Sequence, residues 1–290
     1  MEIIPLAFDS LGTRSMCTSV ITKDVKIMID PGVSLAPRRY NLPPHPLELE
    51  RQGLHWKEIV KYTRECDIII ITHYHYDHHN PEEDLDIYKD KLVFIKHPED
   101  HINKSQAKRA AYFLKKIEGI PKEILFSDGN QFTFNNTKIT FSPPVFHGTN
   151  NKLGYVTEVL IDDGYKLIHT SDVEGPAIPD QVDFILKNKP NLVIIDGPLT
   201  SMLGFRYSQA NLDASNENMI KIINECPVDT LIIDHHILRD LKWKERIAGV
   251  FQVAQEKGVK LITAAEFSGK PIDMLEAHRR ESYKEHPISS

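Results

Sequence analysis

Cysteine is scarce in this chain of 290 residues, which has only Cys17, Cys66 and Cys226, without paired spacing. An odd and sparse count excludes a disulfide framework and is typical of a reducing compartment. No apolar run approaches the ~18 residues of a membrane span. The opening stretch MEIIPLAFDS lacks the basic and apolar regions of a signal peptide. We therefore expect a cytoplasmic protein with no membrane partner.

An excess of positive charge is also missing, because the formal net charge is −6. Nothing in this balance draws the whole molecule to nucleic acid. The stretch 102–116 carries five lysines and arginines on a predicted helix, which we interpret as a solvated face rather than an RNA-binding site. We expect a small-molecule substrate and no nucleic-acid partner, and the oligomeric state stays open.

Linkers rich in glycine and serine are absent, so we predict one domain over 1–276, followed by a frayed polar tail over 277–290. Apolar runs predict strands at 3–8, 16–22, 26–30, 67–72, 91–97, 131–134, 138–147, 155–162, 166–172, 191–196, 230–234 and 260–264. Helical spacing predicts helices at 56–66, 102–120, 179–190, 216–226 and 244–258. The segments 31–48 and 196–213 are predicted to be long loops. The alternation of helix and strand in the last third predicts an α/β (α+β) fold of four layers, helix–sheet–sheet–helix.

The stretch THYHYDHHN, residues 72–80, places four histidines and an aspartate directly after the apolar run at 67–71. His73 and His75 are two residues apart, so an extended backbone would put them on the same side. Asp77 and His78 follow where the strand should end. Imidazole nitrogens and a carboxylate are ligands that zinc accepts, whereas unmetallated imidazoles clustered in an apolar surrounding would be unfavourable.

This H-x-H-x-D-H pattern after an apolar strand resembles the signature of the metallo-β-lactamase superfamily. Further motifs of the superfamily follow in order, each at a predicted strand end: Asp30 in VKIMIDPG, His147 in FSPPVFHGT, Asp172 in KLIHTSDVEG, and His235 or His236 in TLIIDHHILRD. The resemblance covers nearly the whole chain. It implies the αββα sandwich of that superfamily, and the pair RRYNLPPHP and DHHILRD is similar to an archaeal branch of predicted metal-dependent hydrolases.

The resemblance implies a centre with two divalent metal ions, zinc being expected and Mn²⁺ or Fe²⁺ possible. His73, His75 and His147 would hold one metal, Asp77, His78 and His235 the other, and Asp172 would bridge them. Asp30 would orient a ligand. A hydroxide shared by the two metals would then cleave an ester, thioester, lactone or phosphodiester. Two alternatives are an iron oxidoreductase of the persulfide-dioxygenase type, with one metal, and a non-catalytic binding member of the fold.

Three residues are expected to take part in catalysis: Asp77, Asp30 and His236. His235 is favoured as the last metal ligand from its position after the strand, with His236 as the alternative. The residue that does not ligate would contact the substrate or donate a proton. Two loops supply candidate substrate contacts. These candidates are Arg38, Arg39, Tyr40 and His45 from the first loop, and Asp196, Arg206 and Tyr207 from the second.

Overall fold

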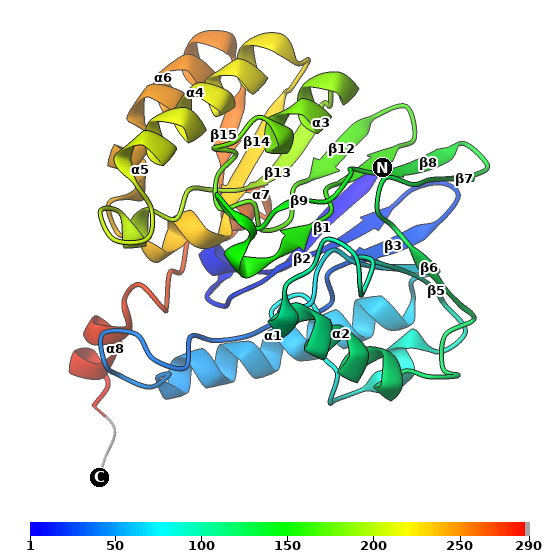
Figure 1. Cartoon of the computed structure of the whole chain (residues 1–290). Helices are drawn as coiled ribbons and strands as arrows, with labels where there is room; N and C mark the ends of the chain where they lie inside the picture. The colour runs from blue at the N-terminus through cyan, green and yellow to red at the C-terminus, as the bar shows by residue number, and fades with distance from the viewer. Residues whose placement is uncertain (288–290) are drawn as a thin grey trace.

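The computed structural model describes residues 1–287, which form two β-sheets packed face to face (Figure 1). The first sheet has the order β1 (Glu2–Phe8), β2 (Met16–Ile21), β3 (Lys26–Ile29), β4 (Ile68–Ile71), β5 (Leu92–Ile95) and β6 (Glu123–Phe126). The second has the order β15 (Lys260–Ile262), β14 (Thr230–Asp234), β13 (Leu192–Asp196), β12 (Lys166–His169), β11 (Val159–Asp162), β8 (Thr137–Phe141) and β7 (Gln131–Phe134). A short pair, β9 (Val145–Phe146) and β10 (Tyr155–Val156), lies beside them.

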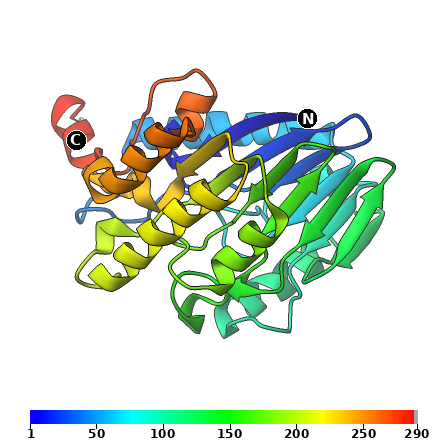
Figure 2. The same cartoon turned by 90° about the horizontal axis from the view of Figure 1, so that it is seen from above.

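Helices cover the outer faces of both sheets. The helices are α1 (Pro46–Arg64), α2 (Lys104–Lys116), α3 (Asp180–Asn188), α4 (Gln209–Glu225), α5 (Trp243–Arg246), α6 (Ala248–Lys257), α7 (Ala264–Phe267) and α8 (Arg279–Glu285). Helices α1 and α2 lie on the first sheet, and α3, α4 and α6 lie on the second (Figure 1). Figure 2 shows α4 and α6 side by side over the second sheet. The predicted order of four layers is therefore confirmed.

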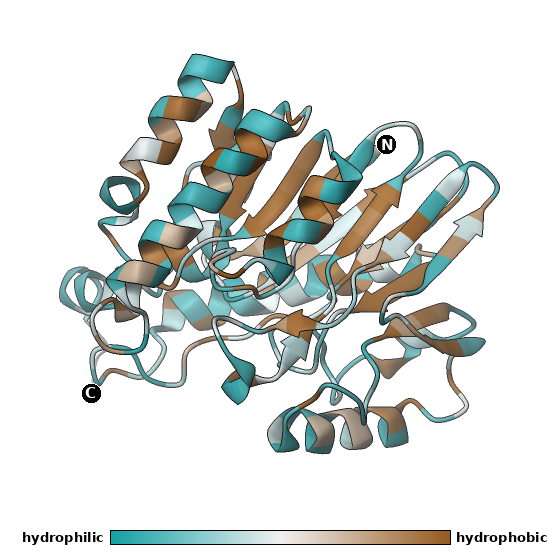
Figure 3. Cartoon of the chain, turned by 45° about the horizontal axis from the view of Figure 1, so that its top comes forward, coloured by the Kyte–Doolittle hydropathy of each residue, from teal (hydrophilic) through white to brown (hydrophobic). Residues whose placement is uncertain are grey.

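Strand β4 shows why a continuous apolar run was needed. Its side chains alternate between the two faces of the sheet, as in any strand. Ile68 and Ile70 enter the core between the sheets, whereas Ile69 and Ile71 pack under α1 and α2. Figure 3 shows the same pattern in both sheets, with hydrophobic strands and helices that carry hydrophilic residues as well. Both faces are buried, so no position in this strand can be polar.

Parallel pairing gives the two sheets a common functional edge. Strands β3 to β6 run parallel to one another, and so do β12 to β15. The carboxyl ends of neighbouring parallel strands meet at one edge, where ligands usually bind in open α/β sheets. All the segments expected to carry metal ligands follow strands.

Both predicted long loops are shorter than expected. His45 caps the amino end of α1 and Pro46 takes its first helical position, which proline tolerates because it has no N–H to satisfy there. Ser208 caps α4 in the same way, with its side chain accepting from the N–H of Asn211. Pro46 therefore marks the start of α1, and the two loops end at 45 and 208. Strand β6 and the short helix α7 were not predicted.

The expectation of a frayed tail is wrong for 277–287. Helix α8 is ordered, and the Arg279 guanidinium is fully buried against the Glu48 carboxylate at 2.7 Å. A buried arginine needs such a partner, and this ion pair joins α8 to α1. Residues 288–290 lie outside the described part. Within 1–287 no helix is both long and apolar enough to cross a bilayer, and the three cysteines are buried and free.

Candidate metal centre

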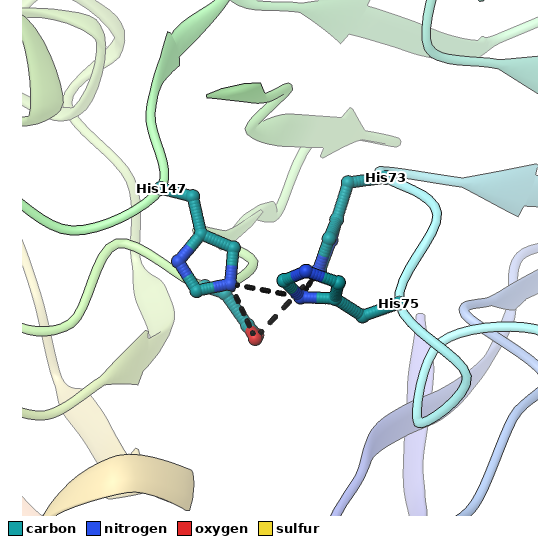
Figure 4. Close-up of side chains that lie close together, drawn as sticks. His73, His75 and His147 are labelled. Atoms are coloured by element: carbon teal, nitrogen blue, oxygen red, sulfur yellow. Dashed lines mark hydrogen bonds and ion pairs between the residues drawn. The ribbon is translucent and has the colours of Figure 1, made fainter. Parts of the chain in front are cut away.

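The loop after β4 brings two imidazoles, those of His73 and His75, together with the ring of His147, which follows β9. His75 Nδ1 lies 3.1 Å from both His73 Nε2 and His147 Nε2. An Asp172 carboxylate oxygen lies 3.3 Å from His147 Nε2 and 3.7 Å from His73 Nε2. Figure 4 shows the rings of His73, His75 and His147 pointing toward one another. We call these four residues the first group.

A second group lies on the other side of Asp172. Its members are Asp77, His78, His235 and the shared Asp172, whose ligand atoms all lie within 4.8 Å of one another. His78 Nε2 is 3.0 Å from Asp172 Oδ1, and His235 Nε2 is 3.4 Å from Asp172 Oδ2. The structure thus places His235, rather than His236, with the second group.

Buried atoms without partners test whether these groups suit a cation. His78 Nε2 and Asp172 Oδ1 face each other at 3.0 Å, yet both are buried without a hydrogen-bond partner among the described residues. Such atoms are rare in native proteins, since leaving them unsatisfied is costly. A divalent cation would satisfy both, and imidazole with carboxylate is a donor set that zinc accepts. The residues present therefore fit a divalent metal ion.

Carboxylates behind two of the imidazoles fix their orientation. Asp30 Oδ2 accepts from His78 Nδ1 at 2.8 Å, and Asp9 Oδ2 accepts from His235 Nδ1 at 2.7 Å. A carboxylate can only accept, so each ring carries its proton on Nδ1 and turns the lone pair of Nε2 toward Asp172. Asp30 has the orienting position that was expected. Asp9 was missed, although it follows strand β1 as Asp30 follows β3.

The two groups differ in their electrostatics. Burial lowers the pKa of His75 to about 3 and that of His73 well below its usual value, so both rings are neutral. Burial also opposes the charged form of His235, but Asp172 and Asp9 outweigh it and raise its pKa to about 10. Asp172 and Asp30 likewise raise the pKa of His78. Protons and a divalent cation therefore compete for the second group, because a metal-bound histidine must be neutral.

His236 belongs to a third cluster, with Asp196 and the shared Asp172, whose ligand atoms also lie within 4.8 Å of one another. Its Nδ1 lies 2.9 and 3.0 Å from the two Asp196 carboxylate oxygens, and its Nε2 lies 3.8 Å from Glu174 Oε1. Asp196 is fully buried and also accepts from the backbone N–H groups of Glu174 and His236. Asp196 is thus a support behind His236, and not a wall of the cleft as expected. His236 itself lines the cavity described next.

A cavity of about 520 Å³ opens above both groups. His75, Asp77, His147 and Asp172 form part of its lining, together with Glu174 and His236. The arginines of this lining are Arg14, Arg38, Arg39, Arg109, Arg206 and Arg239. The volume is within the usual range for small-molecule sites.

Three of the seven candidate substrate contacts line this cavity, namely Arg38, Arg39 and Arg206. Tyr40 lies outside the lining and donates its hydroxyl to the Ala277 carbonyl at 3.1 Å. Tyr207 is buried and donates to the Asn211 carbonyl, and burial raises the pKa of its phenol. Both tyrosines are therefore structural, and their expected place on the cavity wall is wrong.

Other polar residues near the site also have structural roles, among them His45, the remaining candidate of the first loop. His45 is buried at the start of α1, with Nε2 at 2.9 Å from the His286 carbonyl, and does not reach the cavity. His169 is a buried core histidine, with Nε2 at 2.9 Å from the Met16 carbonyl. His79, in the stretch 72–80, is buried against Phe113. Asp234 accepts from backbone N–H groups, including that of His235.

Several cavity residues gave no clear signal in the sequence. Arg109 was assigned to a solvated helix face, yet it reaches the cavity from α2. Arg239 follows the histidine pair, and its Nε donates to Asp9 Oδ1 at 2.9 Å. Glu174 lies two residues after Asp172. Proximity to a motif could have identified Arg239 and Glu174, but only the folded structure places Arg109 here.

Comparison with solved structures agrees with this architecture. The isothiocyanate hydrolase from Delia radicum gut bacteria has a TM-score of 0.53 and 16% identity, covering 87% of this chain and 94% of that one. A possible metal-dependent hydrolase from Veillonella parvula DSM 2008 has a TM-score of 0.54 and 16% identity, covering 86% and 94%. The diiron β-hydroxylase CmlA from Streptomyces venezuelae has a TM-score of 0.53 and 13% identity, covering 85% and 51%. Such low identities show the fold alone, a four-layer sandwich of the metallo-β-lactamase type.

Curated relatives define the family more narrowly. A UPF0282 protein from Korarchaeum cryptofilum (strain OPF8) is 54% identical over 289 residues, covering 99% of this chain and 96% of its own. A UPF0282 protein from Metallosphaera sedula is 48% identical over 287 residues, covering 98% of this chain and 93% of its own. No family model matches the chain. The chain belongs to the UPF0282 family.

Proposed function

We propose that this chain is a hydrolase that holds two divalent cations, zinc being the expected metal, and cleaves an ester, thioester, lactone or phosphodiester bond. One observation carries the proposal: seven predicted ligands from four separate segments form two groups that share Asp172 beside a cavity. When bound, the cations would activate water as a nucleophile and polarise the scissile group. Two solved proteins with this fold, the isothiocyanate hydrolase and the possible metal-dependent hydrolase, support the same reaction class.

The chain's own side chains have distinct tasks in this proposal. Asp30 and Asp9 hold His78 and His235 with their lone pairs toward Asp172. Asp77 is at the cavity wall, where one carboxylate oxygen lies 3.8 Å from His235 Nε2. His236 is held by Asp196 through Nδ1, so Nε2 is left to hydrogen-bond a substrate or leaving group.

Metal content separates this proposal from an iron oxidoreductase of the persulfide-dioxygenase type. A single iron would need only one of the two groups, and the close approach of both groups to Asp172 supports a centre of two metals. We expect about two zinc ions per chain after purification with zinc, measured by inductively coupled plasma mass spectrometry. One oxygen-sensitive iron per chain would favour the alternative.

Activity is tested on a panel of bis-p-nitrophenyl phosphate, p-nitrophenyl acetate, a thioester and a lactone. Asp77→Asn removes one ligand charge and should abolish turnover of any substrate that the wild type cleaves. Asp183→Asn, the same change at an exposed position of α3, is the control and should keep full turnover. Equal activity of wild type and Asp77→Asn would refute the proposed mechanism.

A further inference from the structure

Arginines reach the cavity from distant parts of the chain. Two of the six are neutralised, since Arg14 pairs with Glu276 at 2.6 Å and Arg239 pairs with Asp9 at 2.9 Å. The cavity rim nevertheless keeps an excess of guanidinium groups in a chain whose net charge is −6. Like charges gathered around a concave surface raise the local concentration of anions.

Four of these arginines form no ion pair with any residue in 1–287. One of the four, Arg39, donates to the Arg239 carbonyl at 2.6 Å, and the other three each come from a different segment. Arg38 lies in the loop before α1, Arg109 on α2 and Arg206 in the loop before α4. Arg38 and Arg206 are exposed. The Arg109 guanidinium lies 4.8 Å from the centre of the Tyr76 ring, and this cation–π contact orients it at the cavity. Arginines that serve only as solvated surface residues would not be expected to converge from three elements on one cavity.

An adjoining cleft of about 210 Å³ extends the cavity on the side of Arg206. The two spaces share Arg206, His147 and Glu174 among their lining residues. Phe205 lines this cleft and is 83% exposed, more than any other large hydrophobic residue described. An exposed aromatic ring next to a charged cavity offers a flat apolar surface for the organic part of a ligand.

We propose that the substrate is a small organic phosphate, an inference that rests on the proposed function and names its substrate class. The phosphate oxygens contact Arg38, Arg109 and Arg206, and the organic remainder lies against Phe205. Arginine forks match carboxylate and phosphate equally well in a single pair. Three guanidiniums approaching from three segments suit a tetrahedral anion with several charged oxygens better than a planar carboxylate.

The test measures binding to the zinc-loaded protein by isothermal titration calorimetry, with adenosine 5′-diphosphate, pyrophosphate and adenosine as probes. Adenosine 5′-diphosphate should bind at least tenfold more tightly than adenosine. Binding of adenosine 5′-diphosphate should weaken about tenfold in each of the variants Arg38→Gln, Arg109→Gln and Arg206→Gln, because each loses one charge-assisted hydrogen bond. Phe205→Ala should weaken the binding of adenosine 5′-diphosphate and leave the binding of pyrophosphate unchanged.

Arg64→Gln is the matched control, because Arg64 is an exposed arginine of α1 whose ion pairs within 1–287 are with Asp84 and Asp86, outside the cavity. It should leave the affinity for every probe unchanged. Wild-type affinity in all three cavity variants would overturn the inference, as would equal binding of adenosine and adenosine 5′-diphosphate. Tighter binding of a single-stranded oligonucleotide than of adenosine 5′-diphosphate would also overturn it, in favour of a nucleic-acid ligand.

The two proposals fail in different ways. If the wild type hydrolyses nothing but arginine-dependent binding is observed, the proposed function is wrong and the arginine site stands. If p-nitrophenyl acetate is cleaved and adenosine 5′-diphosphate does not bind, the hydrolase stands and the phosphate site is wrong. Melting temperatures within 2 °C of wild type would show that each variant is folded.

Discussion

Replacing Asp30 by asparagine tests how the structure prepares His78 for a metal. Asp30 Oδ1 accepts from the Thr72 backbone N–H at 2.8 Å, while Oδ2 accepts from the Thr72 hydroxyl and from His78 Nδ1 at 2.7 and 2.8 Å. An asparagine has one acceptor oxygen and one donor nitrogen. With the oxygen on Thr72, the amide nitrogen faces His78 Nδ1 and moves the ring proton to Nε2. That proton would occupy the lone pair that should face the metal.

The expected size of the effect follows from this change of tautomer. Losing such an orienting partner weakens metal affinity by about 10- to 100-fold, or about 1.4–2.7 kcal/mol. The backbone is not strained by the change, since Asp30 has a φ of 52° and asparagine tolerates this left-handed region well. The loss should therefore appear in metal binding, with little change in the fold.

The assay is competition for zinc against a chromophoric chelator. Wild type should show two binding events, and Asp30→Asn should retain one and weaken the other. Asp67→Asn is the control, because Asp67 also accepts a backbone N–H, that of Lys26 at 2.8 Å, but at the opposite end of β4. Two events of wild-type affinity in Asp30→Asn would refute the orienting role of Asp30.

Three further predictions concern the frame of the site. Gly32→Ala should lower the melting temperature and the zinc stoichiometry, because a Cβ at this position would lie 2.3 Å from the His79 backbone nitrogen. An unchanged zinc stoichiometry would contradict this prediction. Arg279→Met should cost about 3–5 kcal/mol in urea denaturation by leaving the Glu48 carboxylate buried and unpaired, and a loss below about 1 kcal/mol would contradict it. Burial raises the pKa of Glu158, whose carboxylate oxygens have no partner among the described residues, so the folded state holds this proton more tightly than the unfolded state. The stability that this proton contributes is full below pH ~4.3 and is lost as the pH rises through the folded pKa. Glu158→Gln should therefore flatten the fall in unfolding free energy between pH 5 and pH 8. Parallel curves of unfolding free energy against pH for variant and wild type would contradict this.

The sequence predicted the parts of the fold that depend on local patterns. The run at 67–72 could only be a strand buried on both faces, and His73 to His78 are close in sequence. Their convergence needed no long-range information. The downstream ligands His147 and Asp172 were assigned from the order of motifs in a resembling superfamily. Local chemistry alone would not have connected them.

Long-range contacts explain what the sequence could not predict. Asp9 supports His235 across 226 positions of the chain, and no local pattern joins the two. Arg109 reaches the cavity because of the rotation of α2, which hydrophobic periodicity defines only within a turn. Tyr207 looked like a loop residue, but the turn before α4 buries its ring. Burial of such side chains is a property of packing and not of composition.

Anomalous X-ray diffraction at the zinc edge, on crystals of the zinc-loaded protein, tests the central claim most directly. Two peaks should appear on opposite sides of Asp172, one next to His73, His75 and His147 and the other next to His78 and His235. A single peak, or peaks remote from Asp172, would contradict a centre of two cations joined by this carboxylate.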